Sequence, residues 1–180
     1  MKMTSLGLAI LVANFASTIA SGATEPGELI EPLESLRPFI GKTWRGEFKN
    51  STEERPLIDV ARWERALNGK AVRVVHSIND GSYGGESVIH WDEEKGQIRY
   101  HYFSTAGFYN VGVMTITNQT ITAIEEVVGN KDGVTEVRST YELRPDSTML
   151  NRSQYLKNGK PSGGREVLYK EDAKAVVKFK

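Results

Sequence analysis

The chain changes its hydrophobic period once, near residue 43. Before that point apolar residues recur at helical spacing, which predicts one or two turns of helix with a single apolar stripe, formed by Leu33, Leu36, Phe39 and Ile40. Pro38 and Gly41 are expected to end this helix. From Thr43 onward the period is two, because Trp44, Gly46 and Phe48 alternate with charged residues. Such alternation is typical of a strand with one face in a core and the other in water.

The rest of the chain repeats this alternating pattern. Further strands are predicted at residues 57–67, 71–79, 85–92, 98–104, 108–117, 120–128, 134–143, 148–157 and 165–170. Residues that tolerate a positive φ or close tight turns lie between them, as at Asn68-Gly69, Asp80-Gly81 and Asn158-Gly159. About ten strands without a long helical pattern predict an all-β fold, an antiparallel meander closed into a barrel with one short N-terminal helix. Closure removes the sheet edges that invite aggregation.

Four segments are predicted along the chain. In residues 1–20 a positive Lys2 precedes a short apolar run and small residues, which predicts a signal peptide cleaved after Ala20 or Ala23; a buried N-terminal helix is the alternative. Residues 21–32 are polar and rich in breakers, so they read as a linker. Residues 33–172 form the barrel domain, and residues 173–180 are a tail or an extra edge strand. We therefore expect an exported protein, periplasmic or secreted, with no membrane-spanning segment after signal removal.

Charge and cysteine content narrow the classes of partner. The chain has 23 basic and 23 acidic residues and no cysteine. A near-neutral balance argues against a nucleic-acid partner, which would need a basic excess on one face. Without cysteine there is no disulfide framework, and the core alone must hold the exported domain together, which suits a bacterial periplasm.

One stretch carries a family resemblance. A short helix followed by Gly41-Lys42-Thr43-Trp44-Arg45-Gly46 and a meander of strands resembles the calycin group, which comprises lipocalins, fatty-acid-binding proteins and nitrobindin-like haem barrels. The chain is most similar to lipocalin-like bacterial exported domains of unknown function. The resemblance covers residues 33–170 and implies a lipocalin-like barrel around a ligand cavity, with Trp44 packed across the closed end. In lipocalins and nitrobindins one residue separates the glycine from the tryptophan, whereas Lys42 and Thr43 both intervene here.

The histidines do not predict a metal or a cofactor. His76, His90 and His101 lie on different predicted strands, and none has the spacing of a ligand pair. Nitrobindin-like barrels hold the haem iron through a histidine on a late strand, and no histidine follows His101. We therefore expect no metal site and no cofactor, haem included.

No catalytic residue is predicted either. The segment at residues 85–89 begins like a nucleophile elbow but lacks the closing glycine. Glu125 and Glu126 are adjacent in a strand, so they point to opposite faces, and we expect them on the surface. Fatty-acid-binding proteins hold a carboxylate with an arginine and a tyrosine two residues apart. The late pairs here, Arg152 with Tyr155 and Arg165 with Tyr169, lack that spacing, so no such role is assigned.

Aromatic and mixed polar positions on the middle and late strands predict the site. Strand parity favours Tyr100 and Tyr102 inside the barrel and Arg99 outside, because burying an unpaired guanidinium is costly. The candidate cavity residues are Trp63, His76, Tyr100, Tyr102, Tyr141 and Tyr155.

Such an interior suits a ligand that is apolar in its body and polar at one end. We therefore predict a protein that binds or carries a small hydrophobic or amphipathic molecule. Two alternatives stay open. One is an enzyme that acts on a small hydrophobic substrate in the same cavity, with His76 as its titrating group. The other is a non-catalytic envelope interaction module whose barrel is filled by side chains.

Overall fold

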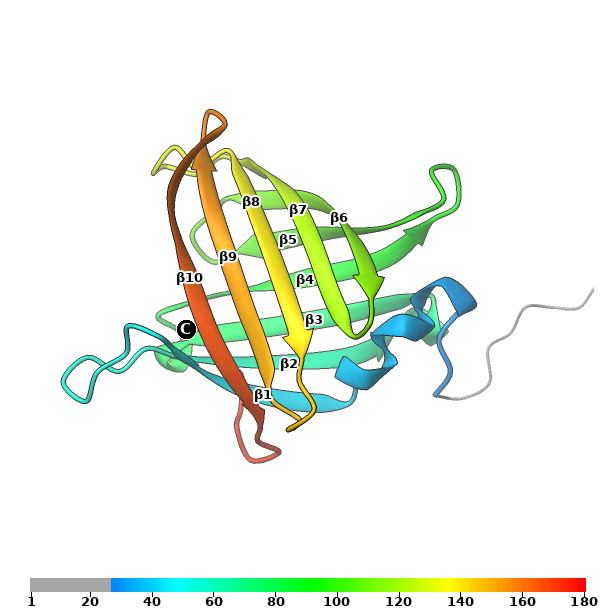
Figure 1. Cartoon of the computed structure of the whole chain (residues 1–180), viewed down its shortest axis with the longest axis horizontal. Coiled ribbons are helices and arrows are strands. Elements are labelled where there is room, and N and C mark those ends of the chain that lie inside the picture. The colour runs from blue at the N-terminus through cyan, green and yellow to red at the C-terminus, as the bar shows by residue number, and fades with distance from the viewer. Residues whose placement is uncertain (1–26) are drawn as a thin grey trace, which may run out of the picture.

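Consecutive strands pair antiparallel around a closed barrel in the computed structural model, which describes residues 27–180 (Figure 1). The strands are β1 (Lys42–Phe48), β2 (Ile58–Ala66), β3 (Ala71–Ile78), β4 (Tyr83–Asp92), β5 (Gln97–Ser104), β6 (Tyr109–Thr117), β7 (Thr120–Val128), β8 (Glu136–Leu143), β9 (Met149–Lys157) and β10 (Lys160–Glu171). The barrel closes where β1 pairs with β10, with Trp44 opposite Glu171 and Phe48 opposite Val167. The predicted fold class is confirmed. The predicted signal peptide and the first part of the linker lie outside the described residues.

Strand β10 is longer than the sequence predicts. It begins at Lys160 rather than Arg165, because the chain reverses at Asn158 and Gly159, whose φ angles are 48° and 77°. Two positive φ angles in sequence are typical of the tight turns that match strand twist. The strand then absorbs a register shift between Pro161 and Gly163. A bulge lets the proline, which cannot donate to the ladder, sit within a paired strand.

The short N-terminal helix is a 3-10 helix, η1 (Glu31–Phe39). Its buried residues Leu33, Leu36 and Phe39 recur every three positions, and three residues per turn put them on one face. Pro38 lies inside the helix instead of ending it, so that detail of the prediction is wrong. Two single 3-10 turns, η2 (Leu67–Gly69) and η3 (Asn79–Gly81), join strands. Among residues 27–180 no helix is long and apolar enough to cross a bilayer.

Helix η1 lies across one end of the barrel and seals it (Figure 1). Leu33, Leu36 and Phe39 are completely buried against the interior. Trp44 is also fully buried, and its indole N–H donates to the carbonyl oxygen of Phe39 at 3.3 Å. The ring of Phe39 packs on Trp63, with 5.6 Å between ring centres. The sealed end is therefore continuous with the interior core.

Residues 173–180 form no strand and lie against the outside of the barrel. The backbone N–H of Lys178 donates to Ser77 Oγ at 3.0 Å, and its ammonium group is 2.8 Å from an Asp80 carboxylate oxygen.

Candidate ligand-binding cavity

The barrel interior encloses a cavity of about 490 Å³, lined by side chains from β2 through β10. Ligand pockets for small molecules are typically about 300–1,000 Å³. The interior is thus not filled by side chains, and the filled-barrel alternative is wrong. All six residues proposed from the sequence lie on the cavity wall: Trp63, His76, Tyr100, Tyr102, Tyr141 and Tyr155.

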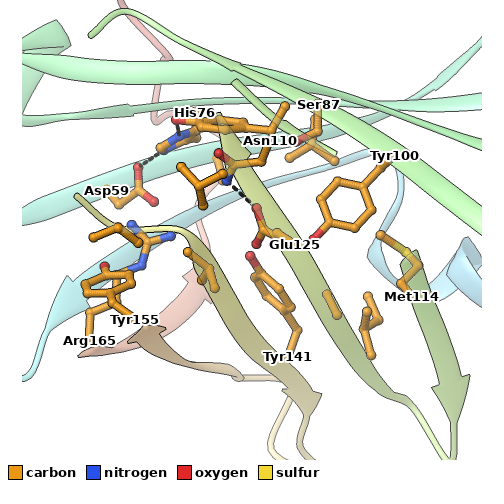
Figure 2. A pocket seen from close by; sticks show the side chains of 18 of the residues that line it. Asp59, His76, Ser87, Tyr100, Asn110, Met114, Glu125, Tyr141, Tyr155 and Arg165 are labelled. Atoms are coloured by element: carbon orange, nitrogen blue, oxygen red, sulfur yellow. Dashed lines mark hydrogen bonds and ion pairs between the residues drawn. The ribbon is translucent and has the colours of Figure 1, made fainter. Parts of the chain in front are cut away.

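The charged groups of the cavity wall gather toward one end. Strand register places a largely apolar group of lining residues toward the end sealed by η1: Trp63, Val74, Ile89, Met114, Ile121, Ala123 and Met149. Charged and hydrogen-bonding residues lie toward the opposite end, where the mouth loops contribute Asn130 and Asp132: Asp59, His76, Tyr83, Tyr102, Asn110, Glu125, Tyr155 and Arg165. The apolar Phe108, Val127, Val134 and Val137 line this end as well. Figure 2 shows the separation of the charged groups, with Met114 far from Asp59 and Arg165.

A chain of four side chains crosses the polar end from β2 to β5. His76 Nδ1 is 3.0 Å from Asp59 Oδ1, and His76 Nε2 is 3.0 Å from the Tyr102 hydroxyl. The Tyr102 hydroxyl is in turn 2.8 Å from the Tyr83 hydroxyl. The second oxygen of Asp59 accepts a hydrogen bond of 2.6 Å from Tyr169 on β10. Asp59 therefore links β2 to β10 by a side-chain hydrogen bond across β1, next to the β1–β10 pairing that closes the barrel.

The ionisation of Asp59 fixes the direction of every hydrogen bond in this chain. Burial acts to raise the pKa of Asp59, but His76, Tyr169 and the charge of Arg165 together hold it below its ordinary value. With the carboxylate ionised, His76 must donate from Nδ1, and in the neutral imidazole Nε2 then accepts from Tyr102. The Tyr102 oxygen then accepts from Tyr83.

A second polar group lies on β5, β6 and β7. Asn110 donates from its amide nitrogen to a Glu125 carboxyl oxygen at 2.5 Å. The Tyr100 hydroxyl is buried, and Figure 2 shows it directed toward Glu125, whose pKa it acts to lower. Burial raises the pKa of Glu125 above its ordinary value, against the opposing effect of the Asn110 hydrogen bond. The site thus holds a carboxyl group that favours its neutral form.

Arg165 is the cation of the polar end. It is half-buried on β10, lines the cavity, and lies beside Tyr155 in Figure 2. Its Nε atom is buried without a partner, and within residues 27–180 the guanidinium forms no ion pair. An arginine remains protonated in this setting. The cavity therefore contains a permanent positive charge whose hydrogen-bond donors have no acceptor among the described residues.

Three cavity tyrosines pack on strand glycines. Tyr100 lies directly opposite Gly112, and Tyr169 directly opposite Gly46. A Cβ atom built on either glycine would collide with the facing tyrosine ring, and one on Gly85 would collide with the ring of Tyr102. The absence of a side chain lets each ring lie close to the neighbouring backbone.

Several residues of this site were not predicted from the sequence: Asp59, Tyr83, Asn110, Glu125, Arg165 and Tyr169. The expectation that Glu125 lies on the surface is wrong; only Glu126 points outward. Glu125 shares the parity of the buried Ala123, but Ile124 and Val128 on the other face are also apolar. Parity alone therefore did not show which face of this strand points into the barrel. Arg165 shares the parity of the buried Val167 and Tyr169, which was the available signal.

Within the described chain no three histidine or acidic side chains gather closely enough to hold a metal ion. His76 is occupied by Asp59 and Tyr102, and His90 stacks on His101 with 6.0 Å between ring centres.

Comparison with known proteins supports the fold alone. No protein-family model matches the chain, and no curated protein sequence matches it significantly. Among solved structures it is similar to the crystal structure of Rv2717c from M. tuberculosis, with a TM-score of 0.58 and 13% sequence identity. The similarity covers 80% of this chain and 99% of that one. At this identity the likeness concerns the arrangement of the strands.

Proposed function

We propose that this protein binds a small amphipathic molecule inside its barrel. The observation that supports this proposal is the polarity gradient of the cavity. Mainly apolar side chains line the end beneath η1, and the charged side chains are gathered at the other end, among hydrogen-bonding and apolar ones. A ligand with an apolar body buries that body toward Trp63 and leaves its polar group near His76 and Arg165. Barrels of this strand number have room for one small ligand.

The free energy of binding comes mainly from transfer of the ligand's apolar body out of water and into the cavity. Removing apolar surface from water contributes about 25 cal/mol per Å². The polar end provides orientation, because buried donors and acceptors penalise a ligand that does not match them.

The test uses N-phenyl-1-naphthylamine, a neutral apolar dye that fluoresces when it leaves water. We expect the purified protein to bind the dye, and a host-derived amphiphile to appear on extraction and mass spectrometry. Ala123 lies buried in the cavity wall, so Ala123→Phe should fill the space and abolish dye binding. Thr122 is its exposed neighbour, and Thr122→Phe is the matched control. Equal dye binding by both variants, or none by the wild type, contradicts the proposal.

A second candidate function is acid–base catalysis on the same ligand. It is favoured by the hydrogen bond from His76 to the buried Asp59, an arrangement that orients an imidazole. The Nε2 atom of His76 faces Tyr102, so a proton would reach the ligand through the tyrosine hydroxyls. Turnover of a bound amphiphile that is lost in His76→Gln, while binding persists, would support an enzyme. Unchanged turnover would exclude His76.

A further inference from the structure

We propose that the cavity selects an anionic amphiphile, whose charged oxygens bind the guanidinium of Arg165. This inference rests on the proposed function and specifies the chemical class of the ligand. The shared chemistry is an oxyanion, either carboxylate or sulfonate, on an apolar tail.

The first observation is the state of Arg165 itself. Its side chain points into the cavity from β10, and its Nε is buried with no acceptor among residues 27–180. A buried charge without a partner costs free energy that folding must offset. Arginine presents its N–H donors as a planar fork that matches the two oxygens of a carboxylate or a sulfonate.

The second observation is that neither Asp59 nor Glu125 pairs with Arg165. Asp59 lies near enough for its charge to act on Arg165, but both of its oxygens are already hydrogen-bonded, one to His76 and one to Tyr169. Glu125 accepts from Asn110, and its burial favours the uncharged carboxyl. The charge of Asp59 is therefore already engaged by other donors.

The third observation is the position of Arg165 along the cavity. Its register partner is Ser153, and Tyr155, two residues further along β9, lies toward the mouth. Lys157 and Asp132 flank that mouth with opposite charges. An anion held by Arg165 would thus lie inside the barrel, below the rim, with the apolar end of the cavity free for its tail.

The test compares four probes of equal tail length at about pH 8, where the carboxylic acid is ionised. Dodecanoate and dodecanesulfonate carry an anion, dodecanol is neutral, and dodecyltrimethylammonium is a cation. The affinity of each probe is measured by its displacement of the neutral dye, at probe concentrations below the critical micelle concentration of that probe. We expect both anions to bind about tenfold or more tightly than dodecanol, because charge-assisted hydrogen bonds are strong in a buried site. The cation should bind most weakly.

Variants of Arg165 complete the test. Arg165→Met should reduce anion affinity about tenfold or more and leave dodecanol binding unchanged. Arg152→Met removes the same charge from the outer face of β9, where Arg152 pairs with Glu166, and should change neither. If Arg165→Met does not fold, Arg165→Lys keeps the charge without the fork and should bind anions with intermediate affinity.

The outcomes separate the two proposals. Equal affinity for dodecanoate and dodecanol, unchanged in Arg165→Met, overturns the anionic class while amphiphile binding stands. Binding of none of the four probes overturns the proposed function itself. Preference for dodecanoate over dodecanesulfonate identifies a carboxylate ligand, and the reverse preference identifies a tetrahedral oxyanion.

Discussion

The carboxylate of Asp59 is 2% exposed and lies 3.0 Å from Nδ1 of His76 on the neighbouring strand. The two residues sit at the polar end of the cavity, and their hydrogen bond sets the proton positions in two tyrosines beyond them. Removing one member of such a pair lowers the free energy of unfolding, because the other member stays buried without a hydrogen-bond partner.

Asp59→Asn should lower the free energy of unfolding by about 3 kcal/mol or more at neutral pH. The amide cannot accept from both His76 and Tyr169 as the carboxylate does, and Arg165 loses the negative charge nearest to it. Urea unfolding of both proteins measures the difference. An unchanged midpoint would show that Asp59 contributes little to stability.

The same pair predicts a pH dependence. The pKa of Asp59 is lower in the folded state than its ordinary value of 3.8, so the unfolded state binds the proton more readily. The stability contributed by Asp59 is therefore present above about pH 4 and disappears as the pH falls through the lowered pKa. The gap in stability between wild type and Asp59→Asn should narrow below that pH. A constant gap would contradict this assignment.

Glu125→Gln should raise stability at neutral pH, by on the order of 1 kcal/mol. Burial raises the pKa of Glu125 above its ordinary value of 4.5, so the folded state binds the proton more tightly than the unfolded state. Wild-type stability relative to the variant should fall as the pH rises from 4.5 toward the raised pKa. Glu126→Gln changes the same charge on the outward face and should stay within about 0.5 kcal/mol at every pH.

The direction of the hydrogen-bond chain predicts that removing the hydroxyl of Tyr102 costs more stability than removing that of Tyr83. Tyr102→Phe removes the donor to His76 Nε2 and the acceptor for Tyr83, and should cost about 1–3 kcal/mol. Tyr83→Phe removes only the last donor of the chain and should cost about 1 kcal/mol or less. Thermal unfolding of the two variants measures the order. The opposite order would mean that the chain runs the other way.

Gly112→Ala should displace the ring of Tyr100, because the new methyl group would occupy the space that the ring fills. We expect a loss of about 1–3 kcal/mol, typical of overpacking. Tyr100→Leu should relieve the clash, so the double variant should lose less than the sum of the single variants. Additive losses would show that the two positions do not touch.

The barrel could be predicted from the sequence because its signals are local. Alternation of side chains and paired positive-φ turn residues specify strands and hairpins, and the ends of β2 to β9 lie within two residues of their predicted positions. The start of β10 was missed because Pro161, Gly163 and Gly164 read as a loop. Only pairing with β9 shows that a bulge accommodates them.

The six predicted cavity residues are aromatic or histidine side chains, which parity and chemistry both favour inside. Asp59, Glu125 and Arg165 were missed for the opposite reason, since a charge at an inward position contradicts the expected cost of burial. The cost of burying these charges is offset by partners that are close in space but distant in sequence. Asp59 is supported by Tyr169, which lies 110 residues away in the sequence, and no local pattern indicates such a partner.

The η1 helix closes one end of the barrel, where the ring of Phe39 packs on that of Trp63. The cavity therefore has a floor at that end. For the proposed amphiphile this floor would set an upper limit on tail length, because a longer tail would carry the charged head past Arg165 and into solvent. The proposed ligand would then be selected by length at one end of the cavity and by charge at the other.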